Sequence, residues 1–480
     1  MMIGLLNLFI IISCIQTHAE SKNIEQGIKK TESSPALEKT QAEKKEDPGN
    51  ADKPKEDDKL ELQSTESWKF KFSGWVSVEH ETIENFGEAV TKNFTSSDRL
   101  NAQTDTNLLA NLQFNLEKEE LKFDSVFEIG EIFYGDSSTG GNQGLRGKNI
   151  EIRNFNFEEK YDKDWYFKVG LWTVNADPRG FILSDHHAAA QIKYESESSA
   201  AQLWVANAVD SKPGTVVAKD IYIGLNYNKN LNEKNNINLF LTQRSTRETF
   251  LDNDLVTLIT GASTYVWLGV HSTHQDIFEK TNFEFNLIGN KSEFKAEAGG
   301  SKDSNSAWLG HARIDRALFK SWDLGLDLLG TSGTSDSRVS GVQVVGRRQN
   351  FASPNPSAAY LLTVATNDGG DDAAGSVRGS AANQIARLDL GEGLRLAVLS
   401  LNKDINERWS GLVRLGKIQS ASENTATRSN DYGSEIDLKV KFKSSRNTAW
   451  IFEAGVFTPG KYFVDRDPAK LVTIKYKVDF

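Results

Sequence analysis

The sequence predicts an all-β protein: a transmembrane antiparallel β-barrel of about 18 strands, preceded by a disordered N-terminal segment. Three observations lead to this prediction. Apolar and polar residues alternate at every second position from about residue 68 onward. Short polar connections between these stretches alternate with long ones rich in Gly, Ser, Asp and Asn. Residues 470–480, KLVTIKYKVDF, form a strand pattern that closes on Phe480.

Residues 1–19, MMIGLLNLFIIISCIQTHA, contain the longest apolar run of the chain. The run is short for a transmembrane helix, which needs about 20 apolar residues, and it ends in small and polar residues. It is therefore predicted to be a secretory signal peptide cleaved after Ala19. A second interpretation is a lipoprotein cleavage site with Cys14 acylated. Because Cys14 is the single cysteine, an intrachain disulfide and a cysteine metal cluster are excluded.

Residues 20–66 consist mainly of charged residues, Ser and Pro, with almost no aromatic residues. Such a segment cannot bury enough apolar surface to offset its ordering entropy. It is predicted to be a disordered linker, with binding of a periplasmic partner as the alternative. The barrel is predicted to occupy residues 67–480. The formal net charge of -10 gives no indication of a nucleic-acid partner.

The predicted strands each have one apolar and one polar face. Successive side chains of a strand point to opposite faces, so apolar residues at every second position define one face. No helical period of about 3.6 residues competes with this pattern over a long window. The clearest stretches are 68–79, 108–117, 165–171, 220–227, 237–244, 322–328, 436–443 and 470–480.

The connections distinguish a transmembrane barrel from a soluble β-sandwich. A barrel has short turns on the periplasmic side and long loops outside, whereas a sandwich has no reason to alternate them. Reading 281–299 as one strand, rather than two around Gly289 and Asn290, makes the strand number even and keeps 331–391 outside. The short connections are 117–120, 160–164, 228–235, 403–408 and 443–447, and the long ones are 134–148, 173–187, 245–262, 331–391 and 417–432.

The last strand is predicted to pair with the strand that begins near Trp68, which leaves no sheet edge in lipid. Phe480, preceded by Val478 and Tyr476, looks like the signal that the barrel assembly machinery reads. Aromatic residues near strand ends are expected to form girdles at the membrane interfaces. These residues are Trp68, Trp75, Trp165, Tyr166, Trp172, Trp322, Trp409 and Trp450.

Several stretches resemble the alginate export family of outer-membrane channels. They are FKVGLWTVNADPRGFILSDH (167–186), SAWLGHARIDRALFKSWDLGLDLLGTSGTSD (306–336), FASPNPSAAY (351–360), YGSEIDLKVKFK (432–443) and AWIFEAGVFTPGKYF (449–463). Their order and spacing fit across most of residues 68–480. The resemblance implies a monomeric barrel of about 18 strands whose arginine-rich lumen passes an anionic polyuronate.

Cations on the polar strand faces are the candidates for solute selectivity in the lumen. They are Lys122, Lys168, Lys193, Arg244, Lys295, Arg313, Arg395, Arg414, Lys439 and Lys441. Carboxylates are expected on the same face, namely Glu128, Asp315, Asp323, Asp327, Glu435 and Asp437. This mixture of charges departs from an arginine-rich lumen, so a general or oligosaccharide-preferring pore competes with a polyuronate channel.

The histidines cluster at SDHH (184–187) and HSTH (271–274). A metal site needs three or four converging ligands, whereas His271 and His274 would point to opposite faces of a strand. Both clusters are assigned to solvated loops, and no metal, cofactor or catalytic residue is predicted. An enzyme at the barrel rim would instead depend on His186 or His187.

The sequence thus predicts a protein of the bacterial outer membrane that allows passive diffusion of small hydrophilic solutes or saccharides through a water-filled lumen. Its expected partners are the bilayer, lipopolysaccharide and the barrel assembly machinery, and it is expected to be a monomer. The long segment 331–391 is expected to fold inward as a constriction or plug. The alternatives are an adhesin or structural barrel with a closed lumen, and a rim-located enzyme.

Overall fold

The computed structural model describes most of residues 68–480; the predicted signal peptide and linker lie outside the described residues. Within the described ranges, no helix has the length and apolar character that crossing a membrane requires. The described residues are 68–84, 103–134, 142–143, 150–209, 219–251, 258–296, 302–319, 321–332, 338–339, 342–343, 394–424, 428–461 and 468–480.

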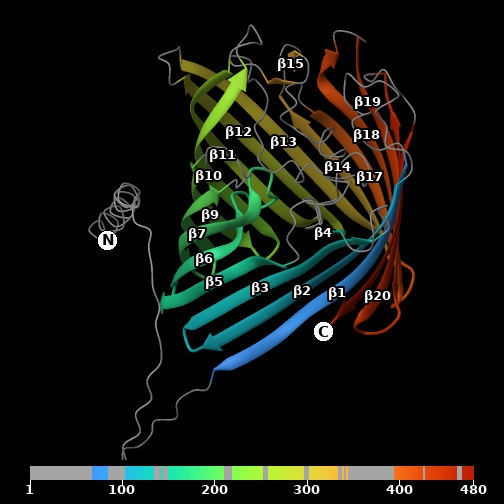
Figure 1. Cartoon of the computed structure of the whole chain (residues 1–480), viewed down its shortest axis with the longest axis horizontal. Helices are drawn as coiled ribbons and strands as arrows, with labels where there is room; N and C mark the ends of the chain where they lie inside the picture. The colour runs from blue at the N-terminus through green and yellow to red at the C-terminus, as the bar shows by residue number, and fades with distance from the viewer. Residues whose placement is uncertain are drawn as a thin grey trace, which may run out of the picture. The chain divides into compact units, whose positions relative to one another are not determined.

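Eighteen antiparallel strands form one closed barrel, which confirms the predicted fold class (Figure 1). Each barrel strand pairs with the next one along the chain, and the first pairs with the last. The strands are β1 Lys69–Glu84, β2 Gln103–Lys118, β3 Leu121–Tyr134, β5 Ile150–Asp162, β6 Trp165–Asn175, β7 Ser184–Glu195, β8 Ser199–Val209, β9 Lys219–Asn232, β10 Asn235–Leu251, β11 Leu258–Phe278, β12 Thr281–Ala296, β13 Lys302–Phe319, β14 Trp322–Thr331, β17 Leu394–Asp404, β18 Trp409–Asn424, β19 Ser429–Lys443, β20 Thr448–Pro459 and β21 Ala469–Asp479. In addition, β4 (Asn142–Gln143) pairs with β3, and β15 (Arg338–Val339) pairs with β16 (Val342–Gln343).

Strand β12 decides the strand count, as predicted. It runs in continuous register with both neighbours through Gly289 and Asn290. Two connections are shorter than predicted, because only 252–257 separate β10 from β11 and only 425–427 and Arg428 separate β18 from β19. Polar residues in these regions resemble loops in sequence, yet they extend the β10–β11 and β18–β19 hairpins, in which the two strands supply backbone partners to each other.

The outward face carries exposed apolar side chains around the barrel, which is the surface that a bilayer covers. Examples are Phe70, Phe157, Leu225, Leu239, Leu268, Leu287, Leu328, Leu399, Leu415, Ile436 and Val472. Four of the predicted girdle residues lie on this face next to the short turns, namely Trp165, Trp322, Trp409 and Trp450. The girdle prediction is wrong for Trp75, Tyr166 and Trp172, since their strand positions place them on the inward face, where lysines lie over their rings.

The barrel closes between β1 and β21, as predicted. The backbone N–H of Phe480 donates to the carbonyl of Gly74 at 3.0 Å, and that of Gly74 donates to the carbonyl of Phe480 at 3.1 Å. The Phe480 ring packs against Phe72, and it lies 3.0 Å from the place that a Cβ on Gly74 would occupy. Glycine at this position therefore lets the terminal ring lie against the first strand.

The apolar core lies inside the barrel, on the half of the inward face nearer the long connections. We call these buried residues the inner belt, and each stands five or more residues from the short-turn end of its strand. The inner belt comprises Trp172, Val174, Trp204, Ala206, Tyr222, Phe240, Tyr265, Trp267, Ile288, Ala307, Leu309, Leu329, Leu396, Val398, Ile418, Tyr432, Phe457 and Leu471. Toward the short turns the inward face is polar, so the inner wall has two zones.

Candidate functional site

The connection between β6 and β7, residues 176–183, folds into the barrel and packs against the inner belt. Phe181, Ile182 and Leu183 are buried and belong to the same apolar cluster. The Asp177 carboxylate holds the turn by accepting the backbone N–H groups of Arg179 and Phe181 at 3.1 Å and of Ile182 at 2.7 Å. Gly180 has a φ of 71°, a left-handed conformation that glycine adopts without strain.

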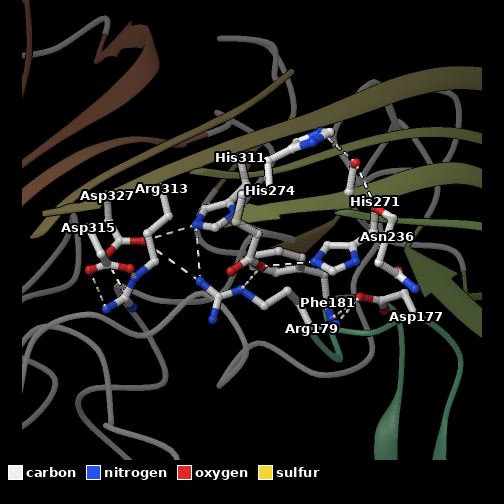
Figure 2. A network of polar contacts seen from close by, with 12 residues as sticks. Asp177, Arg179, Phe181, Asn236, His271, His274, His311, Arg313, Asp315 and Asp327 are labelled. Carbon is white, nitrogen blue, oxygen red and sulfur yellow. Dashed lines mark hydrogen bonds and ion pairs between the residues drawn. The ribbon is translucent and has the colours of Figure 1, made fainter. Parts of the chain in front are cut away.

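Arg179 extends from this connection to the inner wall (Figure 2). Its Nε lies 2.8 Å from a carboxylate oxygen of Glu284 on β12, and its Nη2 lies 3.7 Å from Asp327 on β14. Both carboxylates are largely withdrawn from solvent, with side-chain exposures of 19% and 4%. Arg179 therefore links the β6–β7 connection to strands β12 and β14 of the barrel wall.

Charges of opposite sign alternate across the wall beneath Arg179. Arg313 on β13 lies in register between Glu284 and Asp327, and its Nη1 is 3.5 Å from Asp327. Its Nε also donates to Asp315 at 2.6 Å. Each carboxylate thus has a guanidinium partner, which offsets the cost of withdrawing it from water.

Two imidazoles complete this cluster, which we call the latch network. The Nε2 of His271 is 3.0 Å from Glu284, and the Nε2 of His311 is 3.1 Å from Asp327. The His311 ring also packs against Phe181 of the connection, with centroids 5.4 Å apart. The latch network comprises Asp177, Arg179, His271, Glu284, His311, Arg313, Asp315 and Asp327.

Asp177 is the carboxylate of the network that lies in the connection itself. Burial raises the pKa of its carboxyl above the ordinary value of 3.8, and the three backbone N–H donors and the nearby His271 oppose this rise. The local hydrogen bonds therefore favour the charged carboxylate, whereas burial favours its neutral form.

Three of the predicted lumen cations lie on the inward face against aromatic rings. Lys168 lies 5.1 Å from the ring centroid of Trp172. Lys193 lies 5.6 Å from that of Tyr166 and pairs with Glu195. The Arg244 guanidinium lies over both Tyr222 and Tyr265, at 5.7 and 5.6 Å.

Other predicted lumen cations lie opposite carboxylates on the inward face. Arg414 on β18 faces Asp437 in register, and Lys439 on β19 pairs with Glu453 at 2.6 Å. Lys441 follows two positions later on the same face. Arg313 is the single predicted cation in the latch network, and a selectivity role for all of these residues stays a prediction.

The lumen placement predicted for Arg395 and Lys295 is wrong. Arg395 shares the outward face with Leu399, and Lys295 shares it with Leu287 along the continuous strand β12. The prediction for Arg395 failed because Leu396 is apolar yet belongs to the inner belt. Apolar residues therefore occupy both faces of β17, and alternation alone assigned the faces in the wrong sense.

The predicted assembly residues lie together at the seam of the barrel. Tyr476 packs against Trp450 with ring centroids 4.7 Å apart, Val478 pairs with Val76, and Phe480 pairs with Gly74. All three residues share the outward parity of exposed Val472. Their role as an assembly signal stays a prediction.

The assignment of the histidine clusters to solvated loops is wrong. His271 is buried within β11, and His187 is buried within β7, where it stacks on Tyr222. His271 and His274 do point to opposite faces, because His274 contacts Asn235 and Phe283 rather than Glu284.

Sequence reasoning also missed Arg179 and Asp177, which it placed in a long external loop. The signal was the motif ADPRGFIL, in which an apolar run directly follows a turn. Such a run in a solvated loop would be costly, so it indicated a connection that folds inward. The segment 331–391, expected to constrict the pore, lies outside the described residues apart from Thr331, Ser332 and the β15–β16 pair.

No family model matches the chain, and no curated protein matches it. Among solved structures, the outer membrane protein OpdK from Pseudomonas aeruginosa is similar, with a TM-score of 0.52 and 10% identity over 86% of this chain and 99% of that one. OpdK with vanillate gives a TM-score of 0.51 and 10% identity over 85% and 99%. Pseudomonas aeruginosa OpdQ gives 0.50 and 9% identity over 85% and 98%. These likenesses show a shared fold.

The closed barrel with its apolar outer face is a transmembrane barrel of the bacterial outer membrane. The described inward face carries ion pairs and cation–aromatic contacts, and one connection is held inside by the latch network. Membership of the alginate export family stays a prediction.

Proposed function

We propose that this protein is a passive channel for small hydrophilic solutes, with a lumen narrowed by its own β6–β7 connection. The observation that carries the proposal is the docking of residues 176–183, where Arg179 pairs with Glu284 and Asp327. Barrels of about 16 to 18 strands leave an aqueous interior, so a single docked connection restricts the passage without occupying all of it. The proposal includes no catalytic step.

The charge pattern of the wall favours small solutes over a long polyanion. Several inward cations already have carboxylate partners, as in Lys439 with Glu453, Lys475 with Glu79 and Arg153 with Glu128. A wall neutralised in this way presents little net positive potential to a polyuronate. The resemblance to the alginate export family instead implies transport of a polyuronate, and the experiment below tests this as well.

A second candidate function is a structural or adhesive barrel with a closed lumen. The inner belt favours it, because belt residues on β17, β18, β20 and β21 are as deeply buried as those beneath the β6–β7 connection.

Single-channel currents of the full-length protein in planar bilayers test the proposal. We expect stepwise conductance in the wild type and higher conductance in Arg179→Ala, since the connection loses its ion pairs. Lys439→Ala is the matched control, because it removes the same charge from the wall without touching the connection. Polyuronate and neutral oligosaccharides are then added as blockers. Absence of current from demonstrably folded protein would refute the channel and support the closed barrel.

A further inference from the structure

The lipid-facing surface has a hollow of about 630 Å³ over strands β12 to β18, near the ends joined by long connections. Its apolar walls are the outward side chains of Leu287, Trp308 and Leu328, which are 54%, 51% and 44% exposed. Arg395 and Lys417 also line it. The hollow therefore combines an apolar groove with two cations.

Small residues in adjacent register positions create the hollow. Gly310 on β13 pairs with Gly330 on β14, and the next outward pairs place Ala312 and Ala397 on either side of Leu328. The Trp308 indole lies across the two glycines, 3.5 and 3.6 Å from the positions that their Cβ atoms would occupy. The missing side chains of the two glycines thus form the groove in the barrel wall, and the Trp308 indole bounds it.

The two cations stand on the same outward face as this groove. Arg395 pairs in register with Gly330, and Lys417 pairs with Ala397. Lys417 has one carboxylate partner, Asp431, at 2.5 Å. Among the described residues, Arg395 has no carboxylate within ion-pair distance. Cations on the lipid face destabilise a barrel when they lie in hydrocarbon, so their depth decides what they contact.

Interfacial tryptophans give the depth of these cations. Lys417 lies eight positions beyond Trp409 (417 − 409), and Gly330, opposite Arg395, lies eight positions beyond Trp322 (330 − 322). Strands tilted by about 40° rise roughly 2.5 Å per residue along the membrane normal, which gives about 20 Å. The apolar band is about 25 Å tall, so the backbone at both cations lies about 5 Å below the outer boundary, and the long side chains of Arg395 and Lys417 span that gap to the headgroups.

We propose that this hollow binds a phosphorylated glycolipid of the outer leaflet, namely lipopolysaccharide through its lipid A. An acyl chain lies in the groove between Leu287, Trp308 and Leu328, and a lipid A phosphate contacts Arg395 and Lys417. Charge complementarity carries the assignment: a phosphate accepts charge-assisted hydrogen bonds from guanidinium and ammonium groups at the depth where lipid A phosphates lie. The Asp431 carboxylate holds Lys417 and leaves Arg395 as the main contact.

Native mass spectrometry of the full-length protein in detergent tests the proposal, with bisphosphorylated lipid A and its dephosphorylated form as probes. We expect retention of the phosphorylated form, with affinity falling about fivefold for Arg395→Ala and less for Lys417→Ala, because the Lys417 ammonium is already paired with Asp431. Lys403→Ala is the matched control. Lys403 is also outward, over Trp322 at the periplasmic end, and its removal leaves lipid A binding unchanged.

A second variant fills the groove and keeps both cations. Ala397→Phe places a ring between Leu328 and Lys417, so it displaces the acyl chain and lowers retention by a similar factor in a folded barrel. Equal retention of both lipid forms, or retention that neither the cation variants nor Ala397→Phe changes, would overturn the proposal. So would a wild type that retains no lipid A, as happens if residues 333–393 of this chain cover the hollow.

Discussion

The two zones of the inner wall differ in what surrounds them, although the same strands build both. Toward the short turns, the inward face carries partly exposed pairs such as Lys439 with Glu453. Toward the long connections, the same face carries the inner belt, where Phe240 and Trp267 are 1% and 0% exposed. The inward face is therefore polar near the short turns and apolar at the level of the inner belt, against which the β6–β7 connection packs.

The β6–β7 connection shows how the two zones meet. Phe181, Ile182 and Leu183 bury apolar surface against the inner belt, and Arg179 engages the latch network below it. Each fully buried side chain of this kind stabilises the docked state by about 1.5–3 kcal/mol. Arg179 adds ion pairs with Glu284 and Asp327 to this apolar contact.

The largest expected effect comes from truncating the inner belt. Phe240→Ala leaves a cavity in a packed region, so the free energy of unfolding should fall by about 3–5 kcal/mol. Phe452→Ala is the matched control, since Phe452 lies on the lipid face at 39% exposure and lipid fills the space. Urea unfolding in bilayers measures both variants. Equal losses would show that the inner belt is not a packed core.

The next effect tests whether the latch network holds the connection. Glu284→Gln keeps the shape of the side chain but removes the charge that Arg179 and His271 contact. Docking should weaken by about 1.5–3 kcal/mol, the value of a hydrogen bond to a charged group. Single-channel recordings should show the higher-conductance state, in which the connection is undocked, more often than in the wild type. Unchanged recordings would assign docking to the apolar contacts alone.

A smaller effect concerns Asp177 and pH. Because burial raises the pKa of Asp177, the docked connection binds a proton more tightly than the undocked one. This contribution stabilises docking below pH 3.8 and is lost as pH rises through the raised pKa. Asp177→Asn should shift docking by about 1 kcal/mol and remove this component of the pH dependence. The low-conductance state, in which the connection is docked, should therefore depend on pH differently in the wild type and in Asp177→Asn. An identical pH dependence in both proteins would contradict this prediction.

The smallest effect is expected in the polar zone. Lys439 is 41% exposed, so water screens its pair with Glu453. Lys439→Ala should change the free energy of unfolding by at most about 1 kcal/mol, and less at high salt. Chemical unfolding at two ionic strengths measures this. A loss as large as that of Phe240→Ala would abolish the distinction between the zones.

The sequence predicts the barrel well because lipid imposes one rule on every strand. Apolar residues such as Val472 and Ile474 must recur at every second position, and an even strand number follows once 281–296 is one strand. The latch network was not predictable in the same way. It brings Arg179 to Glu284 and Asp327 through a packed connection, and no periodicity in the sequence encodes that contact.

Arg395 shows where the alternation of apolar and polar residues no longer identifies the lipid-facing side of a strand. Leu396 and Leu399 are both apolar, but one packs inside the barrel and the other faces lipid. Periodicity identifies a face only when the opposite face is polar. In the inner belt both faces are apolar, so the assignment depends on which residues pack inside the barrel, and that is a tertiary property.

The seam between Gly74 and Phe480 has a consequence for folding kinetics. These residues are 406 positions apart (480 − 74), so pairing them in an open chain closes a very long loop. Each of the other strand pairs joins neighbours in sequence and closes a shorter loop. The folding pathway with the smallest loop-closure entropy cost adds hairpins in order and pairs the first and last strands at the end. The seam amides are therefore expected to gain protection from hydrogen exchange last during refolding.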